Sequence, residues 1–282
     1  DKITLVWMKN EDALAAAQKG EVDIAEVPLN YANQSVDNMT NVMLNSVDIR
    51  YISLPVQNDT GQVNPDGQHL GNNVTADPAI RQALNYGVNR SSIISGALYG
   101  HGTPAYSTVG QQLPWYNPDV NISDGDVAKA KQILADNGWK DTDGDGIVEK
   151  NGVKAEVDLY YSSDDPVRQA IAVSTQEQAK KIGIQFNPVG ASWDEIDNYK
   201  FNSSVVWGGG SSDPDTVYTQ YYSELAGQGY DNPSLVNNSV SDKYMLEAKN
   251  TTDVSQSYAL WEKAIWEGSN GVSVQGDAPI LA

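Results

Sequence analysis

The hydrophobic positions near the start of the chain alternate between strand-like and helix-like spacing. Residues 3–7 form a short apolar run that predicts a strand, and the Ala-rich residues 11–18 predict a helix that ends at Gly20. Residues 22–27 alternate again and predict a second strand. A short helix over 30–41, a strand over 48–56 and a polar loop over 58–73 are predicted to follow.

The clearest helix signal begins at Asp77. Its carboxylate is a good N-cap, Pro78 suits the first helical position, and apolar residues recur every fourth position from Ile80 onward. We expect one helix to continue to residue 98 and to stop at Gly100. Residues 102–118 are rich in Gly, Pro and aromatic residues without a clear period, which is typical of a crossover between lobes.

Helices and strands alternate through the rest of the chain. Asp126, Asp165 with Pro166, and Asp213 with Pro214 each mark a helix start. The predicted helices lie at 126–137, 165–182, 193–199, from 213 onward, at 241–249 and at 254–267, and the predicted strands at 153–161, 184–189 and 205–207. This alternation predicts an α/β fold with crossover connections.

The charge balance narrows the class of partner. The chain carries 18 Lys plus Arg against 37 Asp plus Glu, a formal net charge of −19, which disfavours phosphate backbones and anionic lipid, so we expect no nucleic acid partner. It has no cysteine, which excludes disulfides, thiolate metal sites and cysteine nucleophiles. No run of about 18 apolar residues, the length that a membrane-spanning helix needs, is present.

Catalytic signatures are absent from the sequence. It contains no nucleophile elbow, phosphate-binding loop or dinucleotide fingerprint. A glycosidase needs two carboxyls facing one cleft, and the pairs Asp164/Asp165 and Asp194/Glu195 are candidates. Both pairs lie at predicted helix starts, where acidic residues are common. We therefore expect a binding protein and not an enzyme.

Several segments, in order, resemble the peptide/nickel-binding family of extracellular solute-binding proteins. Residues 77–90 (DPAIRQALNYGVNR), with LYG at 98–100 and GTPA at 102–105, resemble the family's fingerprint segment. GEVD at 20–23 and the segments 130–146 and 165–183 are also similar in order and spacing. The resemblance covers essentially the whole chain. It implies a two-lobed, periplasmic-binding-protein-like α/β fold (type II, peptide/nickel cluster).

The resemblance also implies a division into lobes. Members of the family are about twice as long, so we expect part of lobe one plus most of lobe two. The expected parts are lobe one at 1–103, a hinge or crossover at 104–112, lobe two at 113–272 and, at 273–282, a truncated strand returning to lobe one. A binding cleft needs both walls, so the opposing wall is expected outside this chain.

The candidate solute-binding site is the loop that follows the strand at 205–207. It comprises Trp207, Gly208, Gly209, Gly210, Ser211, Ser212 and Asp213, with Tyr218 on the next helix. Glycines let a ligand approach the backbone, and the carboxyl ends of strands are where α/β sheets bind ligands. The alternative is a packed strand end with a structural Trp207, and Tyr218 either lines the cleft or packs.

The resemblance bears on the kind of solute. In peptide-binding relatives this loop carries an aspartate that pairs with the amino terminus of the ligand, and Gly210 stands at that position here. Nickel-type relatives begin the loop with Trp-Gly, lack the aspartate and stack the ligand on the Trp. The resemblance therefore favours a metal chelate or another small polar solute over an ordinary peptide.

An acidic segment follows the helix at 126–137. Asp141, Asp143, Asp145 and Glu149 stand at positions 1, 3, 5 and 9 of an EF-hand-like loop and predict a structural calcium site. Position 12 is Gly152 in place of the bidentate glutamate, so a solvated helix-to-strand turn is the other interpretation. A calcium-dependent extracellular surface or adhesion protein built on this loop is the alternative function.

The resemblance implies the solute-binding component of an ABC importer. Such a protein captures a nickel chelate or a short peptide outside the membrane, closes by a hinge motion and delivers the solute to the permease. We expect a monomer with no required cofactor, and nickel only as a bound chelate. We expect an extracytoplasmic location, with the full-length protein anchored to the membrane.

Overall fold

A four-stranded mixed sheet forms the centre of the computed structural model, which describes residues 2–27 and 29–276. The strands, in order across the sheet, are β1 (Ile49–Ser53), β6 (Ser204–Gly209), β4 (Glu156–Ser162) and β5 (Gln185–Ala191). β4 runs parallel to β5 and β6, while β1 pairs antiparallel with β6, so that Tyr51 lies opposite Trp207. The predicted α/β class is confirmed.

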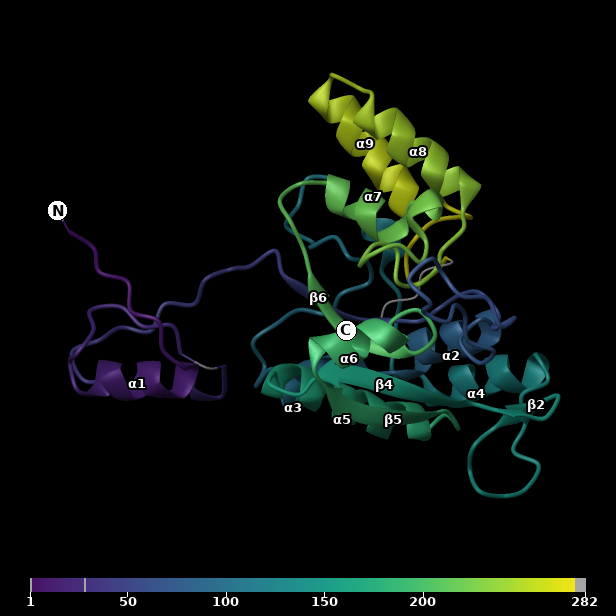
Figure 1. Cartoon of the computed structure of the whole chain (residues 1–282), viewed down its shortest axis with the longest axis horizontal. Coiled ribbons are helices and arrows are strands. Elements are labelled where there is room, and N and C mark those ends of the chain that lie inside the picture. The colour runs from purple at the N-terminus through teal and green to yellow at the C-terminus, as the bar shows by residue number, and fades with distance from the viewer. Residues whose placement is uncertain (1, 28, 277–282) are drawn as a thin grey trace.

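Four helices share the larger hydrophobic core with this sheet. They are α2 (Pro78–Gly87), α3 (Arg90–Ala97), α4 (Val127–Asp136) and α5 (Pro166–Lys180), all in the lower half of Figure 1. α5 connects the parallel strands β4 and β5. Because the strands are parallel, the chain must cross back from the carboxyl end of β4 to the amino end of β5, and α5 makes this crossover. Ile52, Ile80 and Leu134 are almost completely buried where β1, α2 and α4 meet.

A second core joins the sheet to the C-terminal helices. These helices are α6 (Trp193–Tyr199), α7 (Asp215–Tyr221), α8 (Ser239–Lys249) and α9 (Val254–Ile265). Figure 1 shows α7, α8 and α9 stacked together in the upper part of the molecule. Ser241 of α8 donates to the Ala264 carbonyl of α9 at 2.9 Å, which ties the two helices together inside this core.

The predicted capping residues hold most helix starts. The Asp77 carboxylate accepts from the Ala79 amide, and the Asp126 carboxylate accepts from the Lys129 amide. The shorter elements are η1 (Leu29–Tyr31), η2 (Pro118–Val120), η3 (Ser223–Leu225) and the strands β2 (Glu149–Lys150) and β3 (Val153–Lys154). No helix within the described residues is long and apolar enough to cross a bilayer.

The single helix expected from Asp77 to residue 98 is two helices. α2 ends at Gly87, Val88 is extended, and Asn89 begins α3 by accepting a hydrogen bond from the Ser92 amide at 2.7 Å. An asparagine side chain that caps a new helix competes with continuation of the old one. The break lets α2 pack on α4 while α3 packs on α5.

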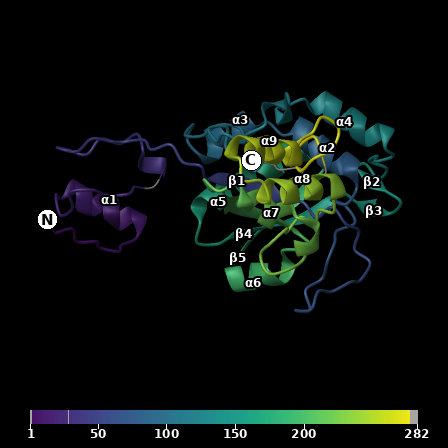
Figure 2. The ribbon, with the colours of Figure 1, turned by 90° about the horizontal axis from the view of Figure 1, so that it is seen from above.

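Residues 2–27 and 29–48 lie outside both cores. The predicted helix α1 (Asn10–Gln18) forms, and Figures 1 and 2 show it beside the main body. The strands predicted at 3–7 and 22–27 and the helix predicted at 30–41 are wrong, apart from the single turn η1. Within the described residues no strand pairs with either segment, and Leu5 and Ile24 are each 92% exposed. An extended segment becomes a strand only where a neighbour accepts and donates its backbone hydrogen bonds.

The division into lobes with a hinge or crossover at 104–112 stays a prediction. β1, α2 and α3, which we expected in lobe one, share their core with α4 and α5. The change in packing falls near residue 48, because β1 pairs with β6 and not with the segment before it. Of the returning strand predicted at 273–282, residues 273–276 form a bend and turn, and 277–282 lie outside the described residues.

Candidate functional site

Trp207 lies near the carboxyl end of β6 and is only 8% exposed. Its indole Nε1 donates to Ser53 Oγ on β1 at 2.9 Å. The ring stacks on Trp193 with 5.7 Å between centroids, and Tyr230 meets it edge-on at 6.2 Å. Trp207 thus packs beneath Trp193, and the solvent-accessible aromatic surface belongs to the half-buried Trp193 and to Tyr230, which is 56% exposed.

Gly208 lies between two guanidinium groups. A β-carbon at this position would stand 2.7 Å from Arg168 Nη2 and 2.7 Å from Arg50 Nη1. Arg50 is the residue of β1 that pairs with Gly208, and Arg168 belongs to the first turn of α5. A side chain at this position would displace one or both guanidinium groups from the backbone. Guanidinium groups form strong, often bidentate hydrogen bonds with carboxylates.

Arg168 is held in place by three contacts. Its Nε donates to Asp165 Oδ2 at 2.9 Å, its Nη1 donates to the Val206 carbonyl at 3.2 Å, and its guanidinium lies 5.0 Å from the centroid of the Trp193 ring. Burial, and then the neighbouring charge of Arg50, lower the pKa of Arg168. A second negative charge at this point would relieve that repulsion.

Arg50 has unused hydrogen-bonding capacity. Its Nη1 pairs with the Asp48 carboxylate, but its Nε is buried and has no acceptor among the described residues. A buried donor without a partner is costly, and a bound acceptor would satisfy it. Sequence reasoning missed both arginines. The only sequence signal was that Arg168 follows the Asp165 cap at the carboxyl end of β4, the same edge of the sheet that β6 reaches.

Gly210 cannot carry a side chain in this backbone. Its φ is +125°, and a β-carbon would stand 2.0 Å from the Val47 carbonyl oxygen. The aspartate that the resemblance places here in peptide-binding relatives is therefore excluded by the path of the chain itself. Gly209 is less constrained, because its β-carbon would meet only the side chains of Gln220, at 3.0 Å, and Tyr51, at 3.7 Å.

The rest of the predicted loop builds the start of α7. Ser211 Oγ accepts from the Asp213 amide at 3.0 Å, and Asp213 Oδ1 accepts from the Asp215 amide at 3.0 Å, while Ser212 is exposed. The N-cap residue is Pro214 and not Asp213, a shift of one position. Tyr218 stacks on Tyr222 at 4.4 Å beneath the ammonium of Lys249, so it packs within the α7–α8 pair.

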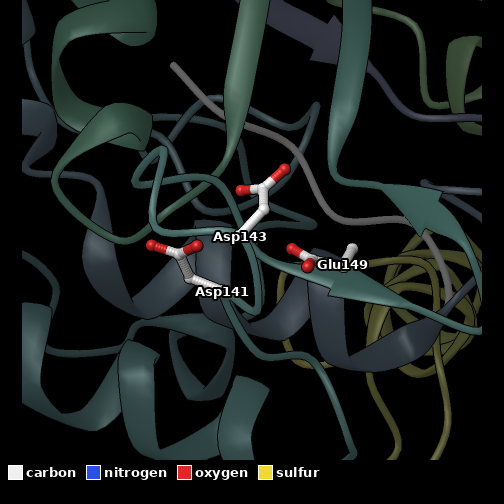
Figure 3. A group of neighbouring side chains, drawn as sticks. All are labelled: Asp141, Asp143 and Glu149. Atoms are coloured by element: carbon white, nitrogen blue, oxygen red, sulfur yellow. The ribbon is translucent and has the colours of Figure 1, made fainter.

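The acidic loop lies elsewhere, between α4 and the hairpin β2–β3, and Figure 3 shows three of its side chains. Asp141, Asp143 and Glu149 each offer a carboxylate oxygen within 4.8 Å of the others, the one such group of three among the described residues. Asp145 is not part of this group and pairs with Lys154. Lys154 also lies 2.8 Å from Asp143, so one ammonium group pairs with two of the four carboxylates of the loop.

Backbone and side-chain donors of the same loop occupy the other two carboxylates. Asp141 accepts from the Gly144 amide at 2.7 Å and from the Gly146 amide at 2.9 Å, and Glu149 accepts from the Thr142 amide at 2.8 Å. The hydrogen bond from Lys154, followed by that from the Ile147 amide, lowers the pKa of Asp145. The loop is thus a turn closed by its own contacts.

Comparison with known proteins gives the family. Residues 1–229 match the model of the bacterial extracellular solute-binding proteins, family 5 (middle region). Protein XP55 of Streptomyces lividans is 34% identical over 240 residues, which is 84% of this chain and 41% of the relative. The oligopeptide-binding protein AppA of Bacillus subtilis is 36% identical over 199 residues, which is 67% of this chain and 36% of the relative.

Solved structures show the same fold. The structure of AppA from Bacillus subtilis with a nonapeptide matches with a TM-score of 0.78 and 29% identity, over 96% of this chain and 52% of that chain. NikZ from Campylobacter jejuni with Ni(L-His) matches with a TM-score of 0.75 and 24% identity, over 96% and 52%. The chain thus spans about half the length of these relatives. It is a member of family 5 of the bacterial extracellular solute-binding proteins.

Proposed function

We propose that this chain is part of the solute-binding component of an ABC importer. It captures a small polar solute outside the membrane and delivers it to the permease, without catalysing a reaction. Family membership supports this role, as do the ligands in the structures of two relatives, a nonapeptide in AppA and Ni(L-His) in NikZ. No feature of the acidic loop or of these relatives favours the calcium-dependent adhesion alternative.

The convergence of Arg50 and Arg168 at Gly208 is the observation that carries the proposal. A carboxylate that reaches this edge of the sheet meets two guanidinium groups, and charge-assisted hydrogen bonds of this kind are among the strongest that proteins form. The partly exposed ring of Trp193 lies beside them and suits the planar or apolar part of the same solute. The site is therefore built for a solute that carries a carboxylate.

The backbone at Gly210 supports one of the two classes of solute found with the relatives. A peptide recognised through its amino terminus needs a negative charge here, and the Val47 carbonyl leaves no room for a side chain. An amino-acid chelate of nickel, or a peptide held mainly by its terminal carboxylate, needs only the arginines. We favour the chelate, since its amino group is bound to the metal and requires no acidic partner.

The chain supplies one wall of the site. Since it spans about half the length of its relatives, we expect the second wall and the membrane anchor in the remainder of the full-length protein, with the hinge near residues 104–112 of this chain. In this arrangement the protein is extracytoplasmic and acts as a monomer, with the membrane permease as its protein partner. The solute enters from outside and requires no resident cofactor.

Calorimetry on the full-length protein tests the proposal. The titrants are nickel with L-histidine, trialanine and trialanine amide, in which only the terminal carboxylate is neutralised. We expect heat from the nickel chelate or trialanine and none from the amide. Arg168→Gln should weaken the binding by roughly 10–100-fold, because it removes a charged hydrogen-bond donor from a partly buried site.

The control is Lys243→Gln, which removes one positive charge from an exposed position on α8. It should bind like the unchanged protein. Heat from the amide equal to that from a binding trialanine, or nickel–histidine binding that Arg168→Gln leaves unchanged, would refute the carboxylate site while leaving the importer role open. Absence of heat from every titrant, with the protein folded, would contradict the importer proposal itself.

A further inference from the structure

Asparagines followed two positions later by serine or threonine are unusually frequent in this chain. The sequence has 24 asparagines and 36 serines plus threonines among 282 residues, so chance pairing predicts 24 × 36/282, or about three, Asn-x-Ser/Thr triplets. It contains nine, and none has proline in the middle. This triplet is the acceptor signal for N-linked glycosylation. The excess over chance shows that composition alone does not account for these triplets.

Six of the nine triplets are open to solvent at both ends. In each of the six, the asparagine and the serine or threonine are both exposed; these triplets begin at Asn33, Asn38, Asn58, Asn121, Asn237 and Asn250. An enzyme that modifies the asparagine must reach both side chains, because the signal is defined by the first and third positions. The six exposed triplets therefore meet the structural requirement for modification.

The fold occupies the other three triplets. Those that begin at Asn73 and Asn202 end in Thr75 and Ser204, and both of these hydroxyl-bearing residues are completely buried. In the third, Asn89 Oδ1 accepts from an amide in the first turn of α3 at 2.7 Å and so caps that helix. An enzyme cannot reach these triplets without opening the fold, so the structure divides the nine into two groups.

Folding does not account for the exposed triplets. Asparagine serves a fold when its side chain caps a helix, closes a turn or tolerates positive φ. Asn33, Asn58 and Asn237 make no side-chain hydrogen bond with a described residue, and none of the three has positive φ. The cap of α8 comes from Asn238, the neighbour of Asn237. These three asparagines thus have no structural role that would explain the triplet.

The triplets also avoid the candidate solute site. None of the nine includes Arg50, Arg168, Trp193 or a residue of the loop 207–213. Modification of the exposed asparagines therefore uses no group that the solute contacts.

We propose that the protein is N-glycosylated at the six exposed asparagines. This inference rests on the extracytoplasmic location that accompanies the proposed function, and the sugar donor is a lipid-linked oligosaccharide. The asparagine Nδ2 forms a bond to the anomeric carbon of the first sugar, while the bond from that carbon to the phosphate oxygen of the donor breaks. The lipid phosphate leaves with the electron pair of this bond, and the amide loses one N–H proton. A saccharide is bulky and hydrated, so it suits these surface positions.

Mass spectrometry of the protein isolated from the organism that produces it tests the proposal. After proteolysis, the peptides that contain the six exposed triplets should carry an added saccharide mass on the asparagine. Peptides that contain Asn73, Asn89 or Asn202 should have the mass of the unmodified sequence, because their triplets are held by the fold.

Ser239 provides a matched pair of variants for one site. It is exposed and makes no side-chain hydrogen bond with a described residue, so its replacement should leave the melting temperature unchanged. Ser239→Ala removes the hydroxyl of the triplet but keeps Asn237, and the Asn237 peptide should lose its added mass completely. Ser239→Thr preserves the signal, and the added mass should remain.

The outcomes separate this inference from the importer role. Unmodified peptides at all six exposed triplets, in a protein recovered outside the membrane, would overturn the inference and leave the importer role intact. An added mass on Asn237 that persists in Ser239→Ala would overturn it as well, because the triplet would then not be the signal. A protein found only inside the cell would contradict the location on which both proposals depend.

Discussion

Replacing Asp124 by asparagine should destabilise the fold far more than its position in a loop suggests. Asp124 lies 2.9 Å from Arg90 Nη1, and the Arg90 side chain is completely buried. The guanidinium also donates to the Ala105 carbonyl at 2.9 Å and to Asn85 Oδ1 at 2.7 Å, with Tyr106 4.9 Å from it. These contacts fasten the start of α3 to the segment that follows it.

The size of the expected loss in the free energy of unfolding follows from the buried Arg90 cation that remains when Asp124 becomes asparagine. Burial lowers the pKa of Arg90, and the hydrogen bond and charge of Asp124 counteract this effect. Removing one partner of a buried pair costs about 3–5 kcal/mol, because the other charge stays buried and uncompensated. Asp124 is 11% exposed, which lets some water reach the pair, so we expect a loss of about 3 kcal/mol in the free energy of unfolding.

Urea unfolding at neutral pH, followed by circular dichroism, measures this loss directly. Asp119→Asn is the control, since Asp119 is exposed and its carboxylate makes no contact with a described residue; it should change the free energy by less than about 0.5 kcal/mol. Replacing both partners, Arg90→Met with Asp124→Leu, should cost less than the sum of the single changes. A loss below about 1 kcal/mol for Asp124→Asn would refute the argument from burial.

Three further predictions concern single positions. Gly210→Ala should lower the free energy of unfolding by about 1–3 kcal/mol more than Gly61→Ala does. Both glycines have positive φ, but only at Gly210 would a β-carbon meet the Val47 carbonyl. Equal losses of the two variants in urea unfolding would contradict this prediction. The pKa of Asp77 lies below its ordinary value, since burial alone would raise it but hydrogen bonds, first from Lys150, outweigh burial. A depressed pKa stabilises the fold above the unfolded value, so the advantage over Asp77→Asn should be constant near neutral pH and shrink below about pH 4. Because Lys154 pairs with Asp143 and Asp145, adding calcium or EDTA should leave the melting temperature unchanged, and Lys154→Met should create a calcium-dependent shift. A calcium-dependent shift in the unchanged protein would contradict this prediction.

Local chemistry determines the elements of the main body that the sequence predicted well. α6 begins and ends at the predicted residues, and α5 begins after the predicted cap at Asp165. Each depends on contacts within a few residues, such as a carboxylate that accepts the amides of the first turn. The break at Val88 was missed because apolar spacing continues across it, and only the packing of α2 on α4 and α3 on α5 distinguishes two helices from one.

Strands and boundaries depended on partners that local patterns do not reveal. Residues 3–7 and 48–56 look equally strand-like in sequence, yet only the second finds a neighbour, β6, more than 150 residues later. This pairing with β6 makes β1 part of the central sheet, while the described residues that precede it lie outside both cores. A pattern of period two states which residues can share a face, and it does not state which segment will supply the hydrogen bonds.

The binding site shows the same division between sequence and tertiary structure. By itself the sequence determined the family resemblance, the glycine-rich loop after a buried strand and the absence of an aspartate at Gly210. Only the tertiary structure brought Arg50 and Arg168 to the two sides of Gly208 and covered Trp207 with Trp193. The physical reason is distance along the chain: caps, turns and helices form from contacts a few residues apart, while a site that gathers a strand partner, a helix start and a loop exists only once the sheet has set their register.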